Sequence, residues 1–227
     1  MPTAIVTGAS RGLGRALTAA LLREGRRVVI DARGARELDD AVRELSALGD
    51  VVAVRGNVTD SDHREALVDA AGPDIDALVN NASVLGPSPQ PALADYPVHA
   101  LEHVYRVNVL APLALVQLVL PRLTAGGAIL NVTSDAAVEP YEGWGGYGSS
   151  KAALEQLTAI LAAEHPDRRI YAVDPGDMRT QMHQDAFPGE DISDRPLPEE
   201  SVPGLLALIH GELPSGRYRA ADLGARV

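Results

Sequence analysis

Short aliphatic runs alternate with amphipathic segments along the whole chain. The runs are rich in Val, Ile and Ala, with little alternation of apolar and polar positions, as in strands buried on both faces of a sheet. They predict strands at 3–7, 27–32, 51–55, 76–79, 128–133, 169–173 and 216–220. The amphipathic segments predict helices at 13–24, 35–47, 60–70, 100–124, 148–164 and 199–210.

This alternation predicts a doubly wound α/β fold, with a parallel seven-stranded, Rossmann-like sheet covered by helices on both faces. We find no repeat and no linker that divides the sequence, so we expect a single domain over residues 1–227. Sheets of this type bind ligands at the carboxyl ends of their strands. The residues that follow each predicted strand are therefore the candidates for a functional site.

The amino-acid composition excludes or disfavours several classes of binding partner and functional site. The 227 residues contain 20 basic and 31 acidic side chains, a net charge of −11, which disfavours binding to nucleic acid or to an anionic membrane surface. The sequence has no cysteine, which excludes disulfides, thiol nucleophiles and thiolate metal sites. No secretory signal is visible, and the longest apolar stretch is too short to span a bilayer. We therefore expect a cytoplasmic protein.

A glycine-rich turn follows the first predicted strand. Gly8, Gly12 and Gly14 form a GxxxGxG pattern that leads directly into the first helix. Glycines in this place permit a tight turn and close approach of the backbone to a phosphate, which the amino end of the helix then faces. The spacing differs from GxGxxG, and a purely structural turn is the alternative.

The end of the second strand bears on the choice of cofactor. An acidic residue there bonds the ribose 2′-hydroxyl of NAD, whereas an arginine accommodates the 2′-phosphate of NADP. Asp31 and Ala32 point to opposite faces of a strand, so only one of them can meet the ribose. Arg33, together with Arg11 of the glycine turn, favours NADP; Asp31 is the competing candidate for NAD, and a solvated surface charge is the alternative reading of Arg33.

Tyr147 and Lys151 lie one helical turn apart, and Lys151 is the only lysine among the 20 basic residues. A tyrosine with a pKa near 10 needs roughly 4 kcal/mol in favour of the phenolate to titrate near pH 7. An ammonium group about 4 Å away supplies about that much at an effective dielectric of ~20. The pair is therefore a candidate general acid–base unit, and an ordinary exposed helix pair is the alternative.

Other polar residues follow the remaining strands. Ser134 follows the fifth strand, where its hydroxyl could orient a substrate carbonyl, and Asn108 interrupts a long apolar helix. Asn81 and Pro175 follow the fourth and sixth strands. Each is weak evidence alone, because turns and helix kinks explain it as well, but all of them are expected at one edge of one sheet.

Together these motifs resemble the short-chain dehydrogenase/reductase family along nearly the whole chain. The segment 7–14 resembles its TGxxxGxG cofactor loop and 80–82 its NNAG element. Tyr147-x-x-x-Lys151, with Ser134 thirteen residues before the tyrosine, resembles its catalytic set. Pro175-Gly176, followed by Thr180, resembles its motif beside the nicotinamide.

The resemblance implies an NADP(H)-dependent oxidoreductase that interconverts an alcohol and a ketone or aldehyde by hydride transfer. In that mechanism Tyr147 transfers the proton, Lys151 lowers its pKa and binds the ribose, Ser134 positions the substrate oxygen, and Asn108 holds a relay water. The implied cofactor contacts are Gly8, Ser10, Arg11, Gly12, Leu13, Gly14, Arg33, Asn57, Val58, Asn81, Ala82, Tyr147, Lys151, Pro175, Gly176, Met178 and Thr180. A homodimer or homotetramer is also implied, and the domain would then be a dinucleotide-binding oxidoreductase domain.

The sequence departs from the family pattern in places. Ser83 replaces the glycine of the third motif, and Asn57 stands where an acidic residue beside the adenine is usual. The 51 residues after Gly176 form a shorter tail than in most members, which weakens inferences about a substrate lid and assembly contacts.

Alternative functions remain open. A non-catalytic NADP-binding regulator of the same fold would need the glycine turn but not the acid–base set. His99 and His103 are one turn apart but lack a third ligand, so we predict no metal site. Trp144 and Phe187 are candidates for lining a substrate pocket, with loop packing as the alternative.

Overall fold

The computed structural model describes residues 1–224; the last three residues of the predicted domain, 225–227, lie outside the described residues. Its strands are β1 (Thr3–Val6), β2 (Arg27–Ala32), β3 (Val51–Arg55), β4 (Ile75–Asn80), β5 (Leu123–Val132), β6 (Arg169–Asp174) and β7 (Gly216–Arg219). Its helices are α1 (Gly12–Arg23), α2 (Ala35–Leu45), α3 (Ser61–Ala71), α4 (Val98–Tyr105), α5 (Ala111–Val119), α6 (Gly145–Glu164), α7 (Gln181–Ala186), α8 (Pro198–His210) and α9 (Ala220–Leu223).

The seven strands form one parallel sheet in the order β3-β2-β1-β4-β5-β6-β7. The strand order reverses direction between β1 and β4, which creates a crevice at their carboxyl ends where two crossover connections part. The predicted single domain with a doubly wound, Rossmann-like sheet is therefore confirmed.

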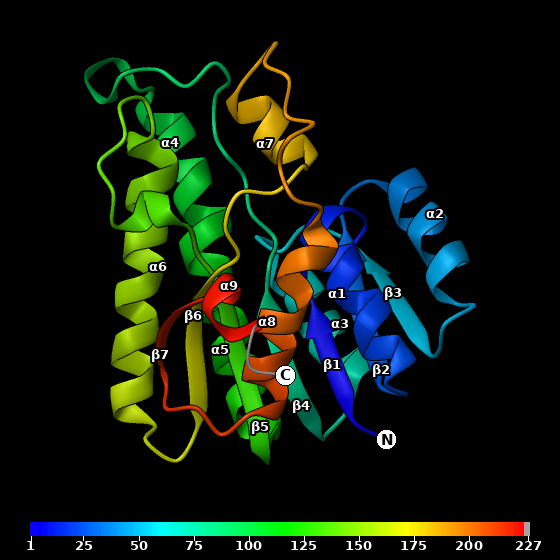
Figure 1. The fold of residues 1–227 in the computed structure, drawn as a ribbon. Helices are drawn as coiled ribbons and strands as arrows, with labels where there is room; N and C mark the ends of the chain where they lie inside the picture. Colours follow the sequence, from blue (N-terminus) through cyan, green and yellow to red (C-terminus); the bar gives the residue numbers. More distant parts are fainter. Residues whose placement is uncertain (225–227) are drawn as a thin grey trace.

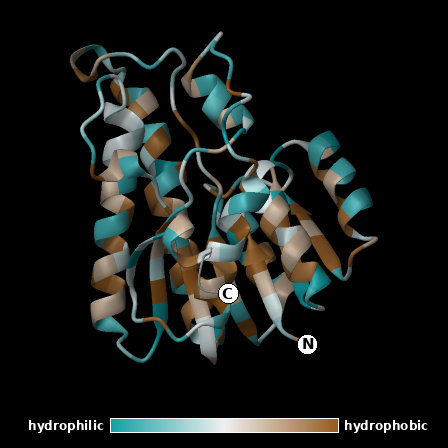
Figure 2. Ribbon diagram, viewed as in Figure 1, coloured by the Kyte–Doolittle hydropathy of each residue, from teal (hydrophilic) through white to brown (hydrophobic). Residues whose placement is uncertain are grey.

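Two layers of helices cover the sheet, as Figure 1 shows. Helices α1 and α8 lie on one face, over a core that includes Ile30, Leu130 and Val173. Helices α3 and α5 lie on the other face, over a core that includes Val29, Leu78 and Ile129. Successive β2 and β5 residues thus enter different cores, which explains why these strands show no apolar–polar alternation. Figure 2 shows the strands as the apolar centre of the molecule.

The prediction of one continuous helix at 100–124 is wrong, because the helix is interrupted and ends before residue 124. A π-helical turn, Arg106–Leu110, joins α4 to α5, and a short 3-10 turn, Leu120–Arg122, precedes β5 at Leu123. Pro121 lies in that 3-10 turn, and a proline has no backbone N–H with which to continue an α-helix. Helix α7, which was not predicted, lies in the segment between β6 and α8.

The helical stretch Val98–Arg122 is long and apolar enough to cross a membrane by composition, and half of its most apolar window is buried inside the fold. Val104, Leu115 and Val119 of this stretch are fully or almost fully buried. Leu115 and Val119 belong to the core on the α3 face of the sheet. The apolar character of the stretch is therefore accounted for in large part by core packing.

Candidate active site

A cavity of about 1240 Å³ runs along the carboxyl ends of the strands. It is lined by most of the predicted site residues, namely Gly8, Ser10, Arg11, Gly12, Leu13, Arg33, Asn57, Val58, Asn81, Ala82, Ser134, Tyr147, Lys151, Pro175, Gly176, Met178 and Thr180. Gly14 and Asn108 do not line it; each lies directly behind residues that do. The fold thus brings residues from seven separate segments to one site.

The glycine turn adopts the backbone that the sequence pattern predicts. Gly8 has φ +65° and Gly12 has φ +56°, conformations that favour glycine. Gly14 is in the first turn of α1, where a Cβ atom would lie 2.6 Å from the Asn81 side-chain nitrogen and 2.8 Å from the Gly8 carbonyl oxygen. The glycines therefore allow α1 to approach the sheet closely and leave its amino end facing the cavity.

Hydrogen bonds fasten this turn to the end of β4. The Thr7 hydroxyl accepts the backbone N–H groups of Asn81 and Ala82, both at 3.0 Å. The Asn81 side-chain amide donates to the carbonyls of Thr7, at 2.8 Å, and Gly8, at 3.2 Å. The side chain of Asn81 therefore shapes the turn, and Asn81 also lines the cavity.

Asp31 lines the cavity, and its carboxylate holds two protein groups. Its Oδ1 accepts the Gly8 N–H at 2.7 Å, and its Oδ2 lies 2.9 Å from Nε2 of His63 on α3. Each oxygen of the Asp31 carboxylate thus has a protein partner, and the side chains of Asp31 and His63 are buried. Asp31 anchors the glycine turn to α3.

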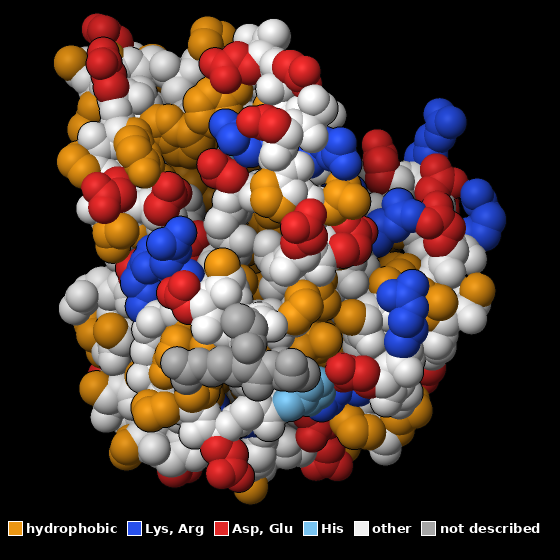
Figure 3. Space-filling model, in the orientation of Figure 1, with side chains coloured by type: hydrophobic (Ala, Val, Ile, Leu, Met, Phe, Trp, Pro, Cys, Tyr) orange, Lys and Arg blue, Asp and Glu red, His pale blue; other side chains and the backbone are white. Residues whose placement is uncertain are grey.

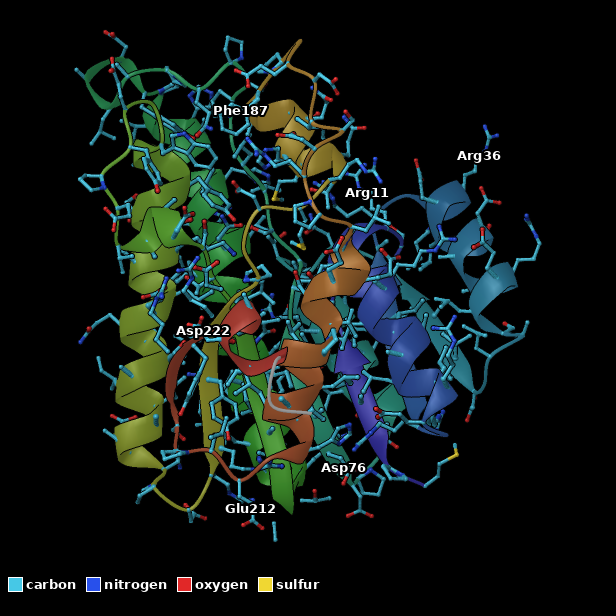
Figure 4. All side chains as sticks on the ribbon, viewed as in Figure 1. Arg11, Arg36, Asp76, Phe187, Glu212 and Asp222 are labelled. Carbon is cyan, nitrogen blue, oxygen red and sulfur yellow. The ribbon has the colours of Figure 1, made fainter. Side chains whose placement is uncertain are left out.

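Arg11 and Arg33 are exposed at the same end of the cavity. Neither side chain forms a hydrogen bond or ion pair with another residue of the 1–224 region. Two unpaired guanidinium groups beside the amino end of α1 make this end of the cavity suited to an anionic group. Figure 4 shows the Arg11 side chain near the loops at the upper end of the molecule.

Tyr147 and Lys151 lie in the first two turns of α6 and point into the other end of the cavity. Tyr147 is 8% exposed and Lys151 is 2% exposed. The Lys151 ammonium lies 5.4 Å from the centre of the Tyr147 ring and donates to the Val132 carbonyl at 2.8 Å. The structure therefore brings the two groups together, and the exposed-pair alternative is wrong.

Burial dominates the electrostatics of this pair. It raises the pKa of the Tyr147 phenol above 10.0, the nearby Asp174 raises it further, and hydrogen bonding with Ser83 lowers it in part. Burial also lowers the pKa of Lys151 from 10.5 to about 8, against the opposing effect of Glu155. The expectation that Lys151 alone brings the phenol close to neutrality is therefore not met. The protein's own groups keep Tyr147 protonated at neutral pH.

Hydroxyl groups surround the phenol. Ser134 follows β5; its hydroxyl donates to the Asp135 carboxylate at 2.9 Å and interacts with Tyr147, lowering the pKa of the phenol slightly. Ser83 lines the cavity from the loop after β4 and also interacts with Tyr147. The sequence pattern indicates Ser83 only as a replacement for the motif glycine and does not predict a contact with Tyr147. Its position directly after the Asn80–Ala82 motif was the available signal for a functional role.

Asn108 lies in the π-helical turn and is 1% exposed. Its Oδ1 accepts the Val84 N–H and the Ser83 hydroxyl, and its Nδ2 donates to the Val84 carbonyl and the Ser150 hydroxyl. Protein partners thus fill all four hydrogen-bonding positions of the amide. The side chain holds Ser83 in place behind the cavity wall.

Two acidic residues that the sequence analysis did not select also line this end. Asp174 is 3% exposed at the end of β6, and its Oδ1 accepts the Gly176 N–H at 3.0 Å. Asp135 follows Ser134 and accepts hydrogen bonds from Ser134 and Tyr141. No group of three or more potential metal-ligating side chains occurs within residues 1–224.

Aromatic side chains form one wall of the cavity. Trp144 and His183 line it, and Phe187 packs behind both, with ring centres at 5.9 Å and 4.9 Å. The Trp144 ring also lies edge-on to Tyr147 at 5.8 Å. Phe187, labelled in Figure 4, comes from the end of α7, and Figure 3 shows apolar side chains gathered in the hollow beside this segment.

Comparison with known proteins agrees with this arrangement. A family model described as short chain dehydrogenase matches residues 2–191. The chain belongs to the short-chain dehydrogenase family. A benzil reductase of Saccharomyces cerevisiae is 35% identical over 193 residues, which cover 80% of this chain and 73% of that protein. An NADPH-dependent aldehyde reductase-like protein of Arabidopsis thaliana is 34% identical over 96% of this chain and 82% of its own.

Solved structures place this short-chain dehydrogenase in the same group. An alcohol dehydrogenase from the archaeon Thermococcus sibiricus, solved with 5-hydroxy-NADP, superimposes with a TM-score of 0.85 at 26% identity. The match covers 96% of this chain and 95% of that one. This short-chain dehydrogenase is therefore an oxidoreductase that uses a nicotinamide cofactor and acts on small molecules.

Proposed function

We propose that residues 1–227 form a single dinucleotide-binding oxidoreductase domain that uses NADPH to reduce a ketone to an alcohol in the cytoplasm. The observation that carries the proposal is the buried Tyr147–Lys151 pair, which faces the same cavity as the glycine turn. One end of the cavity is suited to phosphate and the other to proton transfer. The remaining parts of the proposal depend on how the individual residues fit a cofactor and a substrate.

The glycine turn fits a dinucleotide. Side chains at Gly8 or Gly14 would collide with Ala82 or Asn81, and their absence leaves the amino end of α1 free to face a phosphate. The predicted cofactor residues that line the cavity would hold the rest of the molecule, with Lys151 and Thr180 toward its nicotinamide end. Gly14 supports the turn from behind.

The proposed preference for NADP rests on charge. Each oxygen of the Asp31 carboxylate already binds a protein group, Gly8 or His63, so a ribose hydroxyl would have to share these acceptors. Arg11 and Arg33 remain available for a 2′-phosphate. The name of the Arabidopsis relative includes NADPH, and the Thermococcus structure was solved with a form of NADP.

The nicotinamide, when bound, supplies the hydride. Tyr147 remains protonated at neutral pH because burial and Asp174 raise its pKa, so it is ready to donate its proton to the substrate oxygen. Ser134 and Ser83 would orient that oxygen by turning their hydroxyl protons to it from Asp135 and Asn108, the acceptors to which they donate here. The Lys151 ammonium compensates the negative charge that develops on the phenol. This arrangement favours the direction of reduction.

Asn108 retains its predicted place in the catalytic set as a positioning residue. Its amide is fully engaged, so a relay water would contact its backbone carbonyl instead. The residue four positions later is Pro112, which has no N–H to donate to that carbonyl in an α-helix. The π-helical turn at this point agrees with this, because the backbone hydrogen bonds of a π-helix join residues five positions apart rather than four.

The aromatic wall favours a ketone whose carbonyl carries an aryl group. A carbonyl oxygen that bonds to Tyr147 brings its substituent beside Trp144, whose ring centre is 5.8 Å from that of Tyr147. The chain has one tryptophan and one phenylalanine, and both lie here in contact. Benzil, the substrate for which the yeast relative is named, is itself a diaryl diketone. Edge-to-face aromatic contacts favour such a substituent over an alkyl group of equal size.

The test of the central proposal is NADPH oxidation with a panel of ketones. We expect Tyr147→Phe to reduce turnover by at least about a hundredfold, while NADPH still raises the melting temperature of the variant. NADPH should stabilise the parent protein more than NADH does. Turnover by Tyr147→Phe at the parent's rate would contradict the proton role, and the absence of stabilisation by either nucleotide would contradict the cofactor site.

The test of the substrate class uses acetophenone and cyclohexyl methyl ketone, which have similar size. Because conjugation alone changes reactivity, the measured quantity is the ratio of their kcat/KM values in each variant relative to the parent. We expect Trp144→Leu to lower the aryl preference about fivefold. Tyr141→Leu is the matched control, since Tyr141 contacts Trp144 but does not line the cavity. An unchanged ratio in Trp144→Leu would contradict the aryl preference alone.

We further propose a homodimer or homotetramer formed through the α4–α6 side. Val98 is 69% exposed, Leu110 is 56% exposed and Ile160 is 43% exposed, and all three come from the helices of this side. Apolar side chains exposed together are typical of interaction surfaces. Sedimentation of the parent and of Leu110→Asp/Ile160→Asp tests the proposal, since the charged variant should be monomeric.

A further inference from the structure

Arg217 links two carboxylates that act on opposite members of the catalytic pair. It lies on β7, the edge strand beside β6, with α6 alongside, as Figure 1 shows. Its Nε donates to Oε1 of Glu155 at 2.9 Å, and one terminal nitrogen lies 3.3 Å from Oδ2 of Asp174 and from the Ser134 carbonyl. One guanidinium group therefore joins α6, the end of β5 and the end of β6.

Both carboxylates that Arg217 binds influence the protonation of Tyr147 or Lys151. Glu155 lies one helical turn after Lys151 and raises its pKa; its Oε1 also accepts the Thr133 hydroxyl at 2.7 Å. Asp174 lines the cavity and raises the pKa of Tyr147. The side chains of Glu155 and Asp174 are 15% and 4% exposed, and that of Arg217 is 30% exposed. The network is partly shielded from solvent, so its charges interact more strongly than a surface pair would.

We propose that Arg217 is a positioning residue that balances the charges of Asp174 and Glu155 and thereby sets the alkaline limit of the reaction at Tyr147 and Lys151. The proposal rests on the proposed ketone reduction at the same site. Arg217 acts on the reaction through the two carboxylates, and its hydrogen bond to the Ser134 carbonyl fixes the backbone that presents the Ser134 hydroxyl.

The direction of the effect follows from the charges that face each group. Tyr147 faces Asp174, Asp135 and Lys151, together with the Ser83 and Ser134 hydroxyls, and Lys151 faces Glu155 and Tyr147. Without the Arg217 cation, the Asp174 carboxylate opposes the phenolate more strongly and the Glu155 carboxylate favours the ammonium more strongly. Both Tyr147 and Lys151 then keep their protons to higher pH.

The experiment is the pH profile of kcat for ketone reduction at saturating NADPH. In the parent, kcat should fall at alkaline pH as the catalytic pair loses a proton; we call this fall the alkaline limb. We expect Arg217→Gln to move the midpoint of the alkaline limb to a pH about half a unit higher. Arg217→Lys, which keeps the positive charge, should restore the limb toward its parental position. In the Asp174→Asn background, Arg217→Gln should cause a smaller shift than in the parent, because the carboxylate that it balances is gone.

Arg219→Gln is the matched control. Arg219 lies two residues later on the same strand, is exposed, and forms no side-chain hydrogen bond or ion pair among the residues that the structure describes. The profile of this variant should match that of the parent.

If Arg217 only stabilises the fold, the expected result is different. Arg217→Gln would then lower the melting temperature without moving the alkaline limb, and this result would overturn the inference. An identical shift in Arg219→Gln would overturn it as well, because a general charge effect would then suffice. A parent enzyme that reduces no ketone with NADPH would overturn the proposed function instead.

Discussion

Asp31 and His63 form a buried pair, with Oδ2 and Nε2 2.9 Å apart, beneath the glycine turn. The other oxygen of Asp31 holds the Gly8 N–H. An acidic residue near the end of β2, which sequence reasoning considers for ribose binding, is therefore used to build the phosphate-binding turn. The side chain of His63 reaches it from α3, so a residue 32 positions away supports the conformation of the first loop.

Replacement of His63 tests this support. His63→Ala leaves the buried Asp31 carboxylate with only the Gly8 N–H as partner, and we expect the free energy of unfolding to fall by about 3 kcal/mol. The affinity for NADPH should also decrease, because the turn loses an anchor. Chemical denaturation and nucleotide titration measure both effects. His99→Ala, at an exposed position on α4, should change neither; equal losses in the two variants would contradict the role of His63.

The second prediction concerns the charge at the adenosine end of the cavity. Arg33→Ala should weaken NADPH binding by about tenfold and leave NADH binding nearly unchanged, since the guanidinium is proposed to contact only the 2′-phosphate. Isothermal titration with each nucleotide measures the two affinities. Arg36→Ala is the control, because Arg36 points outward from α2 in Figure 4 and does not line the cavity. A parallel loss of NADH affinity in Arg33→Ala would contradict the assignment.

The third prediction concerns close packing behind the turn. In Gly14→Ala the new methyl group would lie 2.6 Å from the Asn81 side chain and 2.8 Å from the Gly8 carbonyl, so one of them must move. We expect a loss of about 2 kcal/mol in the free energy of unfolding, with weaker NADPH binding. Gly126→Ala adds the same methyl group where nothing lies within 4 Å. Comparable stability of the two variants would show that the space behind Gly14 is not limiting.

The fourth prediction concerns the pH dependence of stability. Burial lowers the pKa of Lys151 in the folded state to about 8 from 10.5, so the unfolded chain binds more protons between these values. Stability contributed by this group therefore rises as the pH rises through that window. The difference in unfolding free energy between the parent and Lys151→Met should increase by about 3 kcal/mol from pH 8 to pH 10.5. A difference that stays constant with pH would contradict the shifted pKa.

The fold could be predicted from the sequence because each local pattern agrees with the whole. The strands lack alternation since both faces are buried, and Gly8 and Gly12 occupy the positive φ values that a glycine pattern suggests. The continuity of helix 100–124 could not be predicted, since apolar periodicity does not reveal a π-helical turn. Helix α7 was missed because its six residues, Gln181–Ala186, are short and contain no buried position.

Site residues that belong to a local sequence motif could be predicted. Site residues whose role depends on contacts between distant segments could not. Tyr147 and Lys151 share one helix face, so their spacing was sufficient. Ser83 and Asp174 act on Tyr147 across the sheet edge, and Asp31 reaches His63 on another helix. These relationships depend on side-chain direction and depth of burial, which also determine the pKa of the phenol.

The concealment of the chain's single lysine has a practical consequence. Because Lys151 is 2% exposed on the cavity wall, an amine-directed label finds no lysine on the molecular surface. Acylation of that side chain would therefore require the interior of the cleft to open or to admit the reagent. The yield of a modified Lys151 peptide, measured by mass spectrometry with and without nucleotide, would report directly on occupancy of the cleft.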